Sequence, residues 1–123
     1  MKSFLLVFVG GGLGSGLRYL ITIAMNQYSK FFPFGTFTVN ILGCLLIGLI
    51  LGYAQKENTL TSNQTLLLAT GFCGGFTTFS AFANENLELI KNGEIFNLSL
   101  YTIGSIIVGV LAVFTGYYII GNR

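Results

Sequence analysis

The stretch from residue 71 to residue 82, GFCGGFTTFSAF, places a glycine pair, two threonines and a serine inside a long uncharged run. Gly74 and Gly75 each lower helix propensity by about 1 kcal/mol, and the hydroxyls of Thr77 and Thr78 compete for backbone hydrogen bonds. Both features favour a break in a helix. Carbonyls that a break frees in mid-membrane are oxygen ligands suited to a hard cation such as Na⁺. A continuous helix with a closely packed glycine pair is the alternative.

Aromatic side chains follow the threonines at helical spacing. Phe79 and Phe82 lie three residues apart on one helix face, and Glu85 continues that face. The edge of an aromatic ring is electropositive, so an anion that passes it edge-on loses less on dehydration than it does in hydrocarbon. Threonine and serine hydroxyls offer further donors. The same rings could equally pack in the core or against lipid.

Asn40 and Arg18 are polar residues within otherwise apolar runs. Asn40, in GTFTVNILG, lies near the centre of its run, so its amide must pair across a helix interface or contact a permeating solute. Arg18 lies about two thirds of the way across its run. A guanidinium there either extends to the membrane surface or serves in a vestibule for an anion.

A third group of small and polar residues recurs near the C-terminus. Tyr101, Ser105 and Gly109 are spaced four residues apart and so share one helix face. This face could extend a polar track for an anion, or it could be another packing seam.

The composition excludes most soluble and catalytic classes. Of the 123 residues, 53% are hydrophobic and 8% are charged, with a mean hydropathy of +0.77, which is typical of a membrane protein. The chain contains no His, Asp or Trp, so His-based catalysis and the usual His/Cys metal sites are excluded. We therefore expect no enzymatic activity and no nucleic-acid partner.

Charged residues divide the chain into four uncharged runs, and only Arg18 interrupts one of them. Each exceeds the ~20 residues that a helix needs to cross a bilayer, and each is too long for a barrel strand. We predict an all-α membrane protein, a single domain over residues 1–123, with four transmembrane helices and the third broken in mid-membrane. The predicted spans are about residues 3–25, 35–54, 65–90 and 97–120. Polar connectors are expected at Pro33, residues 55–64, and Asn92 with Gly93.

Positive charge is balanced across the predicted membrane. Four spans place both termini on one face, which carries Lys2, Lys56 and Arg123, against Lys30, Lys91 and, if it points that way, Arg18. Without a Lys/Arg asymmetry the chain has no strong reason to choose one orientation, so it could insert both ways and pair as an antiparallel dimer. A weak preference set by something other than loop charge is the alternative.

Glycine spacing predicts close helix packing. Glycine makes up 17 of 123 residues, about twice the usual ~7%. Small-xxx-small pairs, which let helix backbones approach closely in lipid, occur at Gly10/Gly14, Gly12/Gly16, Gly48/Gly52 and Gly71/Gly75.

Three segments together resemble one family. GGLGSGLRY in the first span, FGTFTVNILG in the second and GFCGGFTTFSAF in the third are similar, in order and spacing, to segments of the CrcB/Fluc fluoride channels. The resemblance covers the whole chain. It implies an antiparallel, dual-topology homodimer with two fluoride pores and a structural Na⁺ on the two-fold axis, which would resolve the charge balance in favour of insertion both ways.

The resemblance also implies a role for each matching residue. The backbone carbonyls of Gly74 and Thr77, from both copies, would hold the Na⁺. Fluoride would pass the aromatic pair Phe79 and Phe82, the Asn40 amide and a vestibule lined by Arg18. Less diagnostic polar positions of the path are Thr36, Ser80, Glu85, Tyr101 and Ser105, and Gly109 replaces a hydroxyl that some members have at the far end.

The implied function is a fluoride-selective channel that lowers cytoplasmic fluoride by passive efflux across the cell membrane of a bacterium, with fluoride, lipid and a second copy as partners. A small dual-topology proton-coupled multidrug transporter is the alternative, but it would need a carboxylate deep in a span, and Glu85 lies toward the end of one. A structural subunit without transport would leave the Asn40, Phe79 and Phe82 constellation unused.

Overall fold

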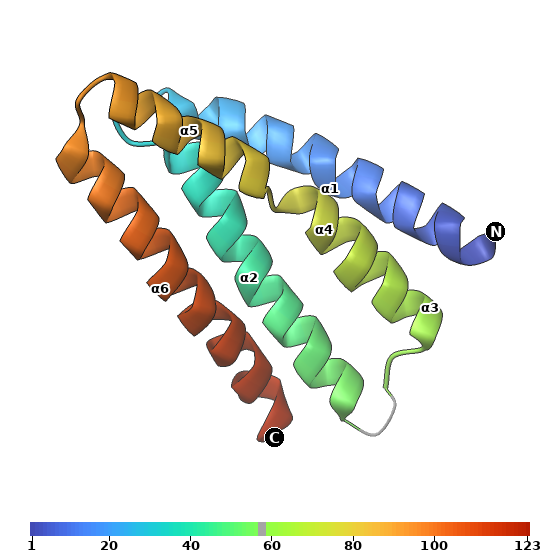
Figure 1. Cartoon of the computed structure of the whole chain (residues 1–123). Coiled ribbons are helices and arrows are strands. Elements are labelled where there is room, and N and C mark those ends of the chain that lie inside the picture. The colour runs from blue at the N-terminus through green and yellow to red at the C-terminus, as the bar shows by residue number, and fades with distance from the viewer. Residues whose placement is uncertain (57–58) are drawn as a thin grey trace.

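A computed structural model describes residues 1–56 and 59–123, and every regular element in these residues is helical (Figure 1). Three spans are continuous helices: α1 (Lys2–Asn26), α2 (Phe34–Gln55) and α6 (Ile95–Gly121). The remaining span, Ser62–Lys91, is divided into α3 (Ser62–Thr65), η1 (Leu66–Cys73), α4 (Gly74–Phe76) and α5 (Phe79–Lys91). The four predicted spans and the break in the third are therefore confirmed. Residues 57 and 58, within the connector expected at 55–64, lie outside the described residues.

Local sequence sets the ends of these helices. Pro33 immediately precedes α2, where its missing N–H costs no helical hydrogen bond. Thr61 and Gln64 form a reciprocal capping box at the start of α3. Asn92 ends α5, and Gly93 adopts a positive φ of 70° in the turn to α6. The turns predicted at Pro33 and at Asn92 with Gly93 are confirmed.

Glycines line the closest helix contacts. α2 packs along α6, and α1 packs along η1 and α4. A Cβ at Gly48 of α2 would overlap the Val113 carbonyl of α6, and a Cβ at Gly14 of α1 would overlap the Phe72 carbonyl of η1. Gly12 and Gly16 form no such contact, since no atom of the described residues lies within 4 Å of an added Cβ at either position. The glycine pairs thus bring backbones together as predicted, apart from Gly12/Gly16.

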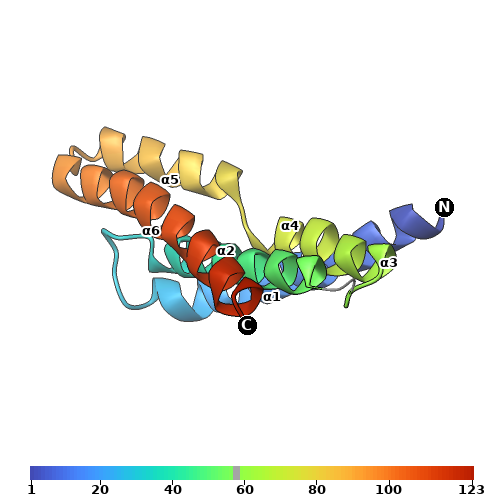
Figure 2. The same cartoon turned by 90° about the horizontal axis from the view of Figure 1, so that it is seen from below.

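The third span changes direction at its break. Its first half, η1, is a π-helix that lies along α1, whereas α5 lies away from the line of α4 and is joined to it by an extended segment (Figure 2). α5 then packs on α6. This displacement brings one face of α5 toward α2 and α6, and that face carries the aromatic and acidic residues of the predicted path.

Candidate functional site

The break lies at Thr77 and Thr78, which have extended backbones with φ and ψ of −87° and 158°, and −151° and 121°. The Thr77 hydroxyl donates to the Cys73 carbonyl at 2.9 Å, the carbonyl that also accepts from Thr77 N–H. The Thr78 hydroxyl accepts from Ala81 N–H at 3.2 Å and so caps the start of α5. Competition by threonine hydroxyls, as predicted, accompanies the end of one helix and the beginning of the next.

The glycine pair is not part of the break. Gly74 has helical φ and ψ of −62° and −38°, and α4 continues through Gly75 to Phe76. A Cβ at Gly75 would overlap the Gly11 backbone of α1. The expectation that the glycines themselves bend the backbone is therefore wrong. The absent side chain of Gly75 instead allows α4 to lie against α1. Such close packing drives helix association in lipid, where no hydrophobic effect acts between helices.

Asn40 of α2 forms two hydrogen bonds with one residue at the break. Its Nδ2 donates to the Thr78 carbonyl at 3.1 Å, and its Oδ1 accepts from Thr78 N–H at 2.8 Å. The side chain thus replaces the helical partners that Thr78 has lost. An amide nitrogen carries two hydrogens, so one donor of Asn40 remains for another acceptor. Of the two predicted roles, pairing across a helix interface is confirmed.

α1 holds the other side of the break. Arg18 Nε donates to the Gly75 carbonyl at 3.0 Å, and the Ser15 hydroxyl donates to the same carbonyl at 3.3 Å. Arg18 is half-buried in this position. The guanidinium therefore points at the broken backbone, and its predicted role in a vestibule stays a prediction.

The break leaves two further carbonyls without their helical donors. In a continuous helix Thr78 N–H would donate to the Gly74 carbonyl and Ala81 N–H to the Thr77 carbonyl. Thr78 N–H instead donates to Asn40, and Ala81 N–H donates to the Thr78 hydroxyl. Both residues with displaced donors, Gly74 and Thr77, line a cavity. The carbonyl oxygens of Gly74 and Thr77 therefore have lone pairs that no helical hydrogen bond uses.

That cavity has a volume of about 470 Å³ and lies between the break, α2, α5 and α6. Every residue of its wall, within the described part of the chain, is uncharged. The Ser105 hydroxyl is buried there and has no hydrogen-bond partner among the described residues. Predicted site residues that line the cavity are Asn40, Gly74, Thr77, Phe79, Phe82 and Ser105.

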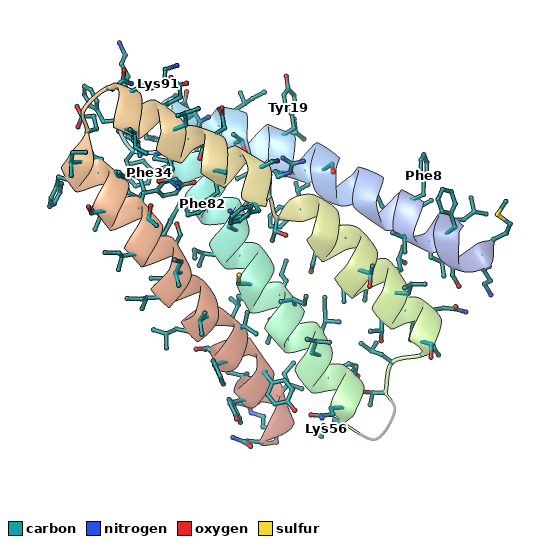
Figure 3. The ribbon with its side chains drawn as sticks, in the orientation of Figure 1. Phe8, Tyr19, Phe34, Lys56, Phe82 and Lys91 are labelled. Atoms are coloured by element: carbon teal, nitrogen blue, oxygen red, sulfur yellow. The ribbon has the colours of Figure 1, made fainter. Side chains whose placement is uncertain are left out.

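The aromatic pair forms one wall of the cavity. The ring centroids of Phe79 and Phe82 lie 5.7 Å apart with an interplanar angle of 42°. Phe79 is 79% exposed in the single chain. Phe82 projects from α5 beside α2 (Figure 3), and its ring centroid lies 5.1 Å from that of Tyr101. Phe82 thus separates the cavity from a second polar group.

Glu85 is the centre of this second group. Its Oε1 accepts from the Thr36 hydroxyl at 2.6 Å, and its Oε2 accepts from the Tyr101 hydroxyl at 2.7 Å. Thr36 and Tyr101 are almost fully buried, at 2% and 0% exposed. Charge-assisted hydrogen bonds of this length are the strong ones, so Glu85 joins α5 to both α2 and α6.

The other predicted positions lie outside the cavity. Ser80 is exposed, with its hydroxyl oxygen 3.2 Å from that of Thr78. Gly109 is buried on α6, where an added Cβ would lie 3.5 Å from Cys44 Sγ. The face predicted from Tyr101, Ser105 and Gly109 therefore includes a packing contact at its far end.

Three residues at or near the site were not predicted from the sequence. Ser15 shares the Gly75 carbonyl with Arg18. Asn86 donates to the Phe82 carbonyl at 3.0 Å and accepts from the Thr102 hydroxyl at 2.8 Å, which links α5 to α6 beside Glu85. Asn86 and Thr102 directly follow Glu85 and Tyr101 in the sequence, and polar side chains within predicted spans are the signal that could have identified them.

Comparison with known proteins gives one consistent result. Residues 5–117 match the protein-family model described as CrcB-like protein, Camphor Resistance (CrcB). The chain is 48% identical over 120 residues to a protein of Flavobacterium psychrophilum, with 97% of each chain covered. It is 49% identical to a protein of Phocaeicola vulgatus, with 96% of this chain and 98% of that protein covered. Both relatives are named fluoride-specific ion channel FluC.

Proposed function

We propose, because this chain belongs to the CrcB family, that it is a fluoride-specific ion channel through which fluoride leaves the cytoplasm down its electrochemical gradient. Relatives with that name match it over nearly their full length. The protein is thus a channel and not an enzyme. Its four apolar spans belong in a membrane, and its bacterial relatives support the cell membrane of a bacterium.

The observation that best supports this function is the uncharged cavity with unused hydrogen-bond donors. Fluoride is small and strongly hydrated, so a selective path must replace its water with donors and avoid a cationic side chain in its wall that would trap it. Asn40 retains one amide hydrogen, and the Ser105 hydroxyl is buried without a partner among the described residues. Phe79 and Phe82, whose ring edges are partly positive, line the same cavity.

The polar group around Glu85 continues the proposed path beyond Phe82. The hydroxyls of Thr36 and Tyr101 are donors that already serve an anionic carboxylate. A fluoride that reaches them competes with Glu85 for the same hydrogens. We place Ser80 at the exposed edge of this path and Arg18 at a vestibule, as the family resemblance implies.

A structural Na⁺ is the second part of the proposal. The chemistry of the donor set fits, because Na⁺ prefers oxygen ligands and half-helix carbonyls at a break supply them. Gly74 and Thr77 are the two residues at the cavity whose carbonyls have lost their helical donors. When bound, the ion would neutralise the negative ends of broken helices. Two carbonyls are too few for a complete shell, so the site requires the same pair from a second chain.

That requirement supports an antiparallel, dual-topology homodimer. Lys56 and Lys91 lie at opposite ends of the helix bundle (Figure 3), as the even distribution of positive charge requires. Phe79, in the cavity wall, is 79% exposed in the single chain, and so large an exposed aromatic surface is suited to cover by a second copy. Inverted insertion would place two identical breaks against each other across a two-fold axis.

Proton-coupled multidrug transport, the alternative considered from the sequence, is not favoured. Both Glu85 oxygens accept hydrogen bonds from buried hydroxyls, so the carboxylate is committed to joining three helices. Membership of the CrcB family agrees with this reading.

Fluoride efflux from liposomes that contain the purified chain tests the proposed function. A fluoride electrode should record release once a potassium ionophore permits charge balance, and chloride-loaded liposomes should release nothing above protein-free controls. Absence of fluoride release, or equal chloride release, would overturn the proposal. Cross-linking tests the antiparallel dimer separately. One population of chains is labelled at one end of the helix bundle and another population at the opposite end, and the mixture should give a single cross-linked species of two chains.

A further inference from the structure

The Arg18 side chain has a defined partner that the fluoride path does not use. Its Nε donates to the Gly75 carbonyl at 3.0 Å, and the Ser15 hydroxyl donates to the same oxygen at 3.3 Å. Ser15 and Arg18 are three residues apart and therefore lie on one face of α1. Neither residue lines the cavity beside the break. The two donors thus reach the break from outside that cavity.

The Gly75 carbonyl depends on hydrogen-bond donors from outside its own span. It lies in the last turn before the break, where carbonyls lack helical donors and carry the negative end of the helix dipole. A guanidinium at a helix C-terminus is the favourable arrangement of charge. Gly75 also lies against the Gly11 backbone, so its peptide is fixed by contact as well as by hydrogen bonds.

Fixing Gly75 constrains the neighbouring peptides. Peptide units are planar, so the unit of the Gly74 carbonyl turns relative to that of the Gly75 carbonyl only through the two dihedrals of Gly75. The Thr77 carbonyl shares its planar unit with Thr78 N–H. On the other side of the break, Asn40 fixes Thr78 through both its N–H and its carbonyl. The Thr77 carbonyl therefore lies between two anchored points, Gly75 held by α1 and Thr78 held by α2, and the Gly74 carbonyl directly precedes the first of them.

We propose that Arg18 and Ser15 are positioning residues that hold the direction of the Gly74 and Thr77 carbonyls and thereby set the affinity of the central cation site. This inference rests on the proposed function for the cation, but its structural part does not. Arg18 acts on the backbone of the break, and an anion in a vestibule is not needed for this role. Loss of the hydrogen bond of Arg18 should make the backbone at the break more mobile while the pore is retained.

Hydrogen–deuterium exchange of the full-length protein in detergent tests the structural part. Arg18→Gln removes the charged donor, and Ser15→Ala removes the weaker one with little risk to folding. Lys2→Gln is the matched control, because it removes one positive charge from an exposed position of the same helix. Amides of residues 76–82 should exchange about tenfold faster in Arg18→Gln, as loss of one charge-assisted hydrogen bond predicts, less so in Ser15→Ala, and unchanged in Lys2→Gln.

Fluoride efflux measured across a series of Na⁺ concentrations, with a large organic cation as replacement, tests the link to the cation. The Na⁺ concentration for half-maximal efflux should rise about tenfold in Arg18→Gln and by less in Ser15→Ala. Ser15 has no place in the proposed fluoride path, so Ser15→Ala should retain the maximal rate at high Na⁺. In Arg18→Lys, which keeps a charged donor, the Na⁺ concentration for half-maximal efflux should lie between those of the wild type and Arg18→Gln. Faster exchange in Arg18→Gln, together with wild-type efflux that does not depend on Na⁺, would leave the positioning role intact and refute the cation site. Unchanged exchange in both Arg18→Gln and Ser15→Ala would overturn the inference.

Discussion

Replacement of Asn40 by leucine tests whether one side chain maintains the broken span. Leucine has a similar size but can form neither of the two hydrogen bonds that join Asn40 to Thr78. Hydrogen bonds between membrane helices contribute about 0.6 to 1.7 kcal/mol each, so the pair contributes about 1 to 3 kcal/mol. Such a free energy changes the equilibrium constant between the broken backbone and other backbone conformations by about 5- to 150-fold. The substitution also removes the donor proposed for fluoride.

Fluoride efflux from liposomes is the assay, and size-exclusion chromatography in detergent checks assembly. Asn40→Leu should lower the efflux rate by at least about fivefold while the protein remains folded. Asn40→Asp should also lower it, because a carboxylate still accepts from Thr78 N–H but repels the Thr78 carbonyl and an approaching anion. Leu42→Ala, at a position of the same helix that is exposed in the single chain, serves as the control. An efflux rate in Asn40→Leu equal to that of the control would refute both roles of Asn40.

Other substitutions and conditions test the remaining parts of the site. Phe79→Ile or Phe82→Ile should strongly reduce fluoride efflux while the dimer still assembles, because an aliphatic side chain has no electropositive edge. Unchanged efflux in both variants would indicate that these rings serve only in packing. Gly48→Ala should lower the thermal midpoint in detergent, since its methyl would overlap the Val113 carbonyl, at a cost of about 1 to 3 kcal/mol. Gly104→Ala should leave the midpoint unchanged or raise it, because none of the described residues has an atom within 4 Å of an added Cβ there. Equal losses in Gly48→Ala and Gly104→Ala would contradict the close-packing argument. Replacement of Na⁺ by a large organic cation should lower efflux or thermal stability, and identical behaviour in both salts would argue against a Na⁺ site at Gly74 and Thr77.

Composition and spacing were enough to predict the membrane class and the elements. Long uncharged runs can be stable in lipid only as helices, so the four spans followed from charge positions alone. Pro33 and Gly93 act through their own backbone restrictions, and their turns were therefore predictable one residue at a time. The family could likewise be recognised from three segments, because their residues and spacing are specific.

The position of the break was harder to predict from the sequence. Gly74 and Gly75 have the lowest helix propensity in the stretch, yet they remain helical because α4 packs on Gly11 of α1. Threonines usually compete only weakly with a helix, and here Asn40 from α2 supplies the hydrogen bonds that Thr78 lacks. Propensity is a local quantity of at most about 1 kcal/mol per residue, and tertiary contacts of similar size decided against it.

The sequence by itself determined which polar groups enter the membrane, since burying them is costly and each needs a partner. Which partner each group found was decided only in the tertiary structure. Arg18 lies against Gly75, 57 residues away, and Thr36 shares Glu85, 49 residues away, with Tyr101. A hydrogen bond requires two atoms within about 3 Å, and helix packing alone sets that distance for residues so far apart in the chain. The chain thus encodes the donors locally and obtains the path only by folding.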